Sequence, residues 1–125
     1  MTNALLISLT VALTVLGQVV LRWQLRVIPP PADAAAYPGF LISCLANPWV
    51  WATVMSAFAA MASWMVVMTR LPLNVAYPFT SASFAGVLVL SYVLLGERPT
   101  LMTVLGTGLI VAGIVVVGLG AAGRT

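Results

Sequence analysis

The sequence lacks most of the side chains that catalysis and metal binding require. It contains no histidine, one cysteine (Cys44) and two carboxylates, Asp33 and Glu97. A single cysteine excludes an intramolecular disulfide, and no cluster of cysteine and histidine is present to hold a metal ion. Few groups are left for acid–base or nucleophilic chemistry. We therefore expect a protein that is not an enzyme and that uses no metal or other cofactor.

Charged residues are also scarce, at 6% of 125 residues, whereas 62% are hydrophobic. A soluble domain carries about 25% charged residues, so lipid rather than water is the expected solvent for most of this chain. The net charge of +3 does not indicate nucleic-acid binding, because the basic residues form no face or stripe. Each arginine lies at the end of an apolar run, where it can reach lipid head groups: Arg22, Arg26, Arg70, Arg98 and Arg124.

Long apolar runs dominate what remains. A membrane-spanning helix needs about 20 mostly apolar residues, and four segments meet that requirement: residues 4–21, 49–69, 74–95 and 100–122. The sequence therefore predicts an all-α membrane protein with four transmembrane helices in a single domain. No positive charge precedes the first span, so we expect it to be retained rather than cleaved as a signal peptide. The arginines divide three to two between the two sides, which leaves the orientation open.

The connections between the spans differ in length. Pro72 interrupts the chain between spans two and three, while Gly96 ends span three and Pro99 is expected to start span four. Short turns favour antiparallel neighbours, so we expect spans two, three and four to pack as one up-down unit. The long connection, residues 27–48, begins with three prolines and contains an apolar stretch too short to span. We predict that this stretch is an interfacial segment on the membrane surface.

Polar side chains recur every fourth residue along the first span, at Thr10, Thr14, Gln18 and Arg22. On a helix this spacing places them on one face. They either hydrogen-bond a neighbouring helix, at about 0.6–2 kcal/mol each, or face a ligand. Gln18 and Arg22 form a candidate head-group pocket, because arginine offers donors suited to phosphate. Glu97 is predicted to lie on the same side of the membrane, where it either pairs with Arg22 or helps to receive the head group.

The third span carries a second polar face, formed by Asn74, Tyr77 and Ser81. Pro78 lies one turn into this span, where it frees a carbonyl and bends the helix. The polar groups are either satisfied within a simple kink, as serines bonded to their own helix would be, or they line a cavity. Both interpretations stay open at this point.

Glycine recurs every seven residues in the fourth span, at Gly106, Gly113 and Gly120. Small residues on one face let membrane helices pack closely. We interpret this glycine face as a seam, either for dimerisation or for packing within the bundle.

Three motifs together resemble the drug/metabolite transporter superfamily. They are LTVLGQ at residues 13–18 with Arg22, LPLNVAYP at residues 71–78 with Ser81, and LGER at residues 95–98. The four-span length and the glycine-rich last helix resemble its small multidrug resistance-like, EamA-like members. Within that group, the motifs are most similar to the small subunits that flip aminoarabinose-linked undecaprenyl phosphate. Those subunits carry lysine where this chain has Arg22, so the charge is kept but a proton-switching role is not expected.

The resemblance implies a flippase, or flippase subunit, for a polyprenyl-phosphate-linked sugar in the bacterial inner membrane. Two copies, or the chain and a related subunit, would enclose a groove between spans one, two and three. The residues expected to bind substrate are Arg22, Gln18, Thr14, Asn74, Tyr77, Ser81 and Glu97.

Two other functions stay in view. One is export of cationic or guanidinium compounds, although the exporters of the superfamily carry a glutamate in the first span where this chain has Thr14. The other is a non-transporting assembly subunit, which the glycine face and the small size would suit.

Overall fold

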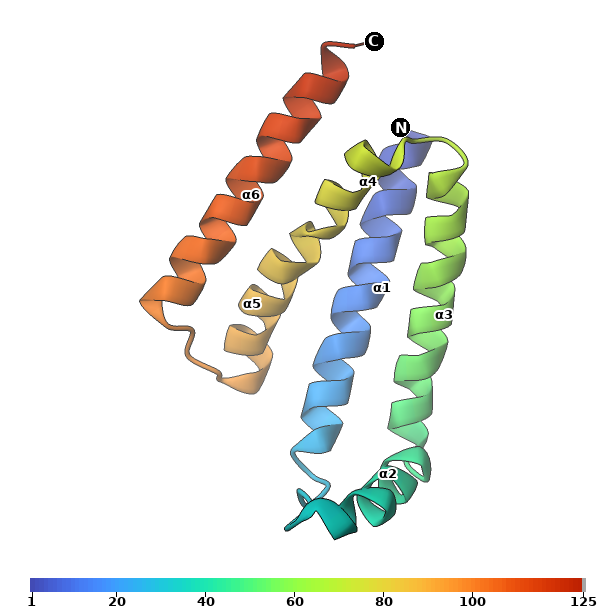
Figure 1. Cartoon of the computed structure of the whole chain (residues 1–125), viewed down its shortest axis with the longest axis vertical. Helices are drawn as coiled ribbons and strands as arrows, with labels where there is room; N and C mark the ends of the chain where they lie inside the picture. The colour runs from blue at the N-terminus through green and yellow to red at the C-terminus, as the bar shows by residue number, and fades with distance from the viewer. Residues whose placement is uncertain (125) are drawn as a thin grey trace.

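A computed structural model describes residues 1–124 (Figure 1). The elements run in the order α1 (Thr2–Leu25), the 3₁₀ turn η1 (Ala34–Ala36), α2 (Tyr37–Leu45), α3 (Pro48–Met68), α4 (Leu73–Thr80), α5 (Ala82–Leu95) and α6 (Leu101–Ala122). Among these residues, four helices are long and apolar enough to cross a membrane: α1, α3, α4 with α5, and α6. The predicted all-α architecture with four spans is confirmed.

The helix ends follow from their capping residues. The Asn47 side chain accepts a first-turn backbone N–H of α3 at 2.9 Å, and the Thr100 hydroxyl accepts one of α6 at 3.2 Å. Gly96 ends α5 in the left-handed conformation, with φ of +67°. The expectation that Pro99 starts the last helix is wrong: it precedes the cap, because the Thr100 hydroxyl can satisfy a free N–H and proline cannot.

The third span is interrupted, as Pro78 predicts. Helix α4 ends at Thr80, Ser81 forms the junction, and α5 begins at Ala82. Proline has no N–H to donate and its ring crowds the preceding turn. Pro78 therefore weakens the helix that contains it, and the break follows three residues later, at Ser81. The two halves are seen as separate segments in Figure 1.

Helix α1 lies between α3 on one side and α5 on the other (Figure 1). It makes its most extensive contact with α3, whereas α3 contacts α4 only slightly and α6 packs on α4 and α5. The prediction that spans two, three and four pack as one unit is therefore wrong. Loop length makes consecutive helices antiparallel, but it does not prevent an earlier helix from packing between them.

Small residues explain the close packing on both sides of α1. A Cβ atom added at Gly17 would lie 3.4 Å from the Ser56 hydroxyl of α3, and one added at Gly86 of α5 would lie 2.9 Å from a methyl of Val15. The Ser56 hydroxyl also donates a hydrogen bond to the Leu13 carbonyl at 2.7 Å. Glycine and serine thus let the α1 backbone approach both neighbours.

The long connection forms the short helix α2 at the end of the bundle where α1 ends and α3 begins (Figure 1). Its Cys44 side is buried, while Leu41, Ile42 and Leu45 are exposed. The Trp51 ring N–H of α3 donates to the Leu45 carbonyl at 2.7 Å and ties the two helices together. An apolar outer surface at the end of the bundle suits the predicted location at the membrane surface.

Within residues 1–124, the glycine face of α6 makes no close packing contact. A Cβ atom added at Gly106, Gly113 or Gly120 would meet no described heavy atom within 4 Å. The bundle-packing interpretation is therefore wrong for these three positions, and dimerisation stays a prediction.

Candidate functional site

A groove of about 350 Å³ opens between α1, α3 and α4. This volume falls in the range of about 300–1,000 Å³ that is typical of small-molecule sites. We call it the first groove, and it lies between the three spans that the sequence indicated. Its polar lining consists of Thr10, Thr14, Gln18, Thr53, Tyr77 and Thr80.

A second groove, of about 470 Å³, lies between α1, α5 and α6. Thr14 and Gln18 line this groove as well as the first, so the polar stripe of α1 forms a wall common to both. The other polar residues of the second groove are Ser83, Ser91, Thr103 and Thr107. The sequence alone predicts no role for α6 in a groove, although the spacing of four between its two threonines places them on a common helix face.

The threonines of the first groove share one hydrogen-bonding pattern. Thr10, Thr14 and Thr53 donate their hydroxyl protons to the carbonyl four residues earlier, at 2.8–3.2 Å. Thr80 donates to the carbonyl three residues earlier, at 2.6 Å. A hydroxyl has one proton, so these oxygens present only lone pairs to the groove. The threonine lining therefore favours ligand groups that carry N–H or O–H donors, and it offers nothing to a bare anion.

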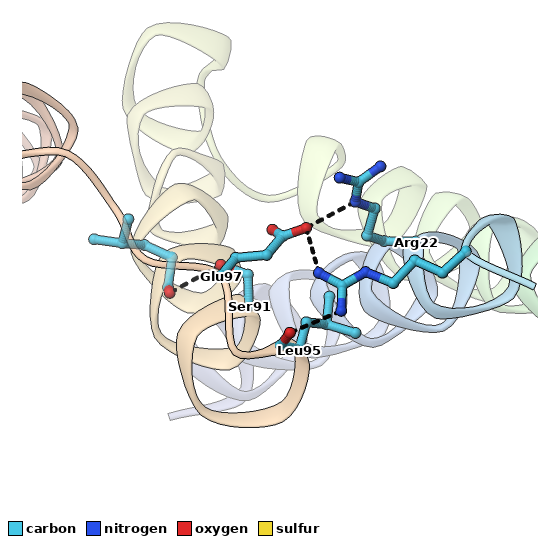
Figure 2. A network of polar contacts seen from close by, with 6 residues as sticks. Arg22, Ser91, Leu95 and Glu97 are labelled. Atoms are coloured by element: carbon cyan, nitrogen blue, oxygen red, sulfur yellow. Dashed lines mark hydrogen bonds and ion pairs between the residues drawn. The ribbon is translucent and has the colours of Figure 1, made fainter. Parts of the chain in front are cut away.

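A charged cluster joins the end of α1 to the turn after α5, and Figure 2 shows the Glu97 carboxylate facing Arg22. Arg22 Nε donates to Glu97 Oε1 at 2.9 Å, and Arg26 Nη2 donates to the same oxygen at 2.8 Å. Arg26 Nη1 also donates to the Leu95 carbonyl at 2.7 Å. The hydrogen bonds from Arg22 and then Arg26 hold the pKa of Glu97 below its usual value. Of the two alternatives for Glu97, this structure forms the pair with Arg22.

The predicted substrate-binding residues of the third span do not all lie in the first groove. Tyr77 lines the first groove and makes an edge-on contact with Trp64, with 5.7 Å between the ring centroids. Ser81 lines an adjoining hollow that also includes Thr14. Asn74 lies apart, in a hollow shared with Arg124 at the end of α6. The structure therefore does not bring Asn74 into the first groove.

Two polar contacts near the end of α1 are not predicted from the sequence. The sequence predicts only an interfacial position for Arg26, yet it joins the Glu97 cluster. Gln24 is buried, and its side-chain oxygen accepts a hydrogen bond from the Asn47 amide at 2.9 Å. Arg26 lies four residues after Arg22, a spacing that could have revealed it as part of the stripe. Nothing in the sequence links Gln24 to a partner so distant along the chain.

Residues 5–119 match the EamA-like transporter family. The chain belongs to this family. It is 31% identical over 121 residues to a protein of Sodalis glossinidius named as a probable 4-amino-4-deoxy-L-arabinose-phosphoundecaprenol flippase subunit, ArnF. That match covers 92% of this chain and 89% of the relative. The resemblance to EamA-like transporters that the motifs indicated is confirmed.

Proteins named as a probable 4-amino-4-deoxy-L-arabinose-phosphoundecaprenol flippase subunit, ArnE, are also similar. The one from Aeromonas hydrophila is 35% identical over 74 residues, or 59% of this chain, and the match spans 65% of that relative's length. The one from Pseudomonas fluorescens strain Pf-5 is 24% identical over 112 residues, with 90% of this chain and 93% of the relative covered. No solved structure matches the chain. With four apolar spans and this family membership, it is a multi-pass protein of the bacterial inner membrane.

Proposed function

We propose that the chain is a flippase, or a flippase subunit, that moves a polyprenyl-phosphate-linked sugar across the inner membrane. The observation that carries the proposal is the polar stripe of α1, because it lines two grooves and ends at a pair of arginines. A polar path with charge at one end suits a head group that has both a neutral and an anionic part. The names of the relatives support the same class of substrate.

The two parts of the head group would bind to different regions. Arg22 and Gln18 would take the phosphate, since arginine is suited to phosphate oxygens. Thr14, Tyr77 and Ser81 would contact the sugar, whose hydroxyl protons match the acceptor oxygens of the threonines. The polyprenyl tail would stay in lipid, so the groove needs to hold only the head group.

The proposed role is transport rather than catalysis, and it involves a second subunit. A groove open to lipid on one side would be closed by another copy of the chain or by a related subunit, as the word subunit in the relatives' names suggests. Asn74, at the other end of the bundle with Arg124, would contact the head group as it leaves. Rocking of two such bundles about a central site is a known way to expose it alternately to each side.

A flipping assay tests the proposal. The purified chain, alone and with a candidate partner subunit, is placed in liposomes that contain a fluorescent polyprenyl-phosphate sugar. Arg22→Ala should abolish flipping while insertion and dimerisation are kept, whereas Arg70→Ala, which removes an arginine at the opposite end of the bundle, should flip normally. Full transport by Arg22→Ala would disprove the phosphate role. Flipping by neither the chain nor the pair would favour an assembly subunit.

Export of cationic compounds is the second candidate. The acceptor oxygens of the groove and the Trp64–Tyr77 pair would also suit an ammonium or guanidinium group. The absence of a carboxylate in α1 argues against it, because nothing there would exchange a proton for the drug. Uptake of a labelled quaternary ammonium or guanidinium compound by the same liposomes, with no flipping of the lipid, would establish export instead.

A further inference from the structure

The charged cluster leaves much of its binding capacity unused. Each guanidinium has five N–H groups, yet the two terminal nitrogens of Arg22 make no described hydrogen bond. Both arginines donate to Oε1 of Glu97, and no described residue donates to Oε2. Two positive charges therefore share one carboxylate oxygen, and the cluster keeps a net charge of +1. An anion with more acceptor oxygens would satisfy these donors better than Glu97 does.

The carboxylate is held in a way that lets it leave. The side chains of Arg22, Arg26 and Glu97 are 59%, 41% and 34% exposed, and ion pairs with that exposure stabilise a fold only weakly. The Glu97 backbone is fixed, because its N–H donates to the Ser91 carbonyl at 3.1 Å and Gly96 sets the turn. A rotation of the Glu97 side chain alone would release both arginines from the carboxylate without moving the helices, and Arg26 would keep its hydrogen bond to the Leu95 carbonyl.

The cluster also lies where the grooves end. Gln18, one turn before Arg22 on α1, lines both grooves, and Ser91, whose carbonyl holds the Glu97 amide, lines the second. An anion bound here would therefore be continuous with a neutral group in either groove. It would also stay outside the region where the threonines present only acceptor oxygens.

We propose that Arg22 and Arg26 together form the phosphate site, and that the Glu97 carboxylate occupies this site when it is empty and is displaced when phosphate binds. The proposal rests on the proposed function and deepens it in two respects. It adds Arg26 as a second binding residue, and it makes Glu97 a competitor of the phosphate rather than one of its ligands. An internal anion that must be replaced keeps the site from holding phosphate too tightly to release it.

The test measures binding rather than transport. The full-length chain in detergent is titrated with undecaprenyl phosphate, with undecaprenol as the tail without phosphate, and with inorganic phosphate, and complexes are counted by native mass spectrometry. Glu97→Gln keeps the shape of the side chain but removes its charge. If the Glu97 carboxylate occupies the site in about 90% of the molecules, this variant should bind undecaprenyl phosphate about tenfold more tightly than the wild type. Arg26→Gln should bind it about tenfold or more weakly, because a charge-assisted hydrogen bond is lost.

Arg98→Gln is the matched control, since it removes one charge from the next residue, and its affinity should equal that of the wild type. Unchanged or weaker binding by Glu97→Gln, in protein whose melting temperature shows that it is folded, would overturn the proposal. Equal losses in Arg26→Gln and Arg98→Gln would also overturn it, since they would show general charge attraction. If inorganic phosphate competes with the lipid, the site recognises phosphate alone. If it does not, the predicted pattern assigns the site to the lipid phosphate.

These results separate the site from the proposed function. If the variants bind with the predicted affinities but no flipping occurs in liposomes, the phosphate site is supported and the flippase function is rejected. Flipping by the wild type with no tighter binding by Glu97→Gln would keep the flippase and reject the displaced carboxylate.

Discussion

Replacement of Gly86 by alanine should destabilise the contact between α1 and α5. The new Cβ atom would lie 2.9 Å from one Val15 methyl, 3.4 Å from the other and 3.7 Å from the Val15 Cβ. Valine on a helix strongly prefers one rotamer, so the Val15 side chain cannot turn away easily. Overpacking of this kind typically raises the free energy of the folded state by about 1–3 kcal/mol.

Alanine is also more favourable than glycine in a helix, by up to about 1 kcal/mol. This gain in stability would hide part of the loss that the clash causes. Gly113→Ala on α6 is the matched control, because its added Cβ meets no described atom within 4 Å. The difference between the two variants cancels the helix term and isolates the clash, at about 1–3 kcal/mol.

The assay is reversible unfolding in mixed detergent micelles, with the chain dilute enough to be monomeric. Val15→Ala in the Gly86→Ala background should recover much of the loss, with a coupling of about 0.5–3 kcal/mol between the two positions. Equal stabilities of the Gly86 and Gly113 variants would refute the packing of α1 against α5. No coupling with Val15 would refute the specific contact.

Three further predictions concern stability in the same mixed micelles, two measured by unfolding and one by melting temperature. Ser56→Ala removes the hydrogen bond to the Leu13 carbonyl and should destabilise the fold by about 0.6–1.7 kcal/mol, as other hydrogen bonds between membrane helices do. Asn47→Ala removes the α3 cap and the bond to Gln24 together, and should destabilise it by about 1–2 kcal/mol. The pKa of Glu97 is lowered, so its ion pairs contribute fully to the stability of the fold at pH values above its ordinary pKa of 4.5. This contribution is lost as the pH falls through the lowered pKa. The melting temperature should therefore fall on acidification in the wild type and less in Glu97→Gln.

Each of these predictions has a control. Ser43→Ala removes a serine hydroxyl that bonds only within α2, so a loss equal to that of Ser56→Ala would contradict a special role for the helix–helix bond. Asn47→Asp keeps a capping oxygen, and it should be more stable than Asn47→Ala. Equal acid sensitivity of the wild type and Glu97→Gln would contradict the Glu97 ion pairs.

The four spans could be predicted because their signal is local. Each is a run of apolar residues long enough to cross a membrane, and the glycine and prolines between them mark the breaks. Helix α1 nevertheless extends to Leu25, beyond the predicted residue 21. The polar residues after residue 21 stay helical because they have partners on other elements, such as Asn47 for Gln24. Such partners are not visible in a hydropathy pattern.

The order of helices around α1 could not be predicted, because it depends on how surfaces fit rather than on loop length. The same limit applies to the candidate site. The spacing of four found Thr14 and Gln18, which line both grooves. It did not find Thr53, which lines the first groove from α3. To predict which residues line the same groove, one must know which faces of which helices meet.

The central place of α1 also has a consequence for how the protein is made. Helix α1 leaves the ribosome before either of the helices that flank it, so it enters the membrane without its packing partners. The side of α1 that accepts the hydrogen bond from Ser56 is covered when α3 is inserted. The side that packs against Gly86 stays uncovered until α5 has been inserted. The packing of α1 is therefore completed only when the third span has been inserted, and until then part of the polar stripe of α1 faces lipid or the insertion machinery.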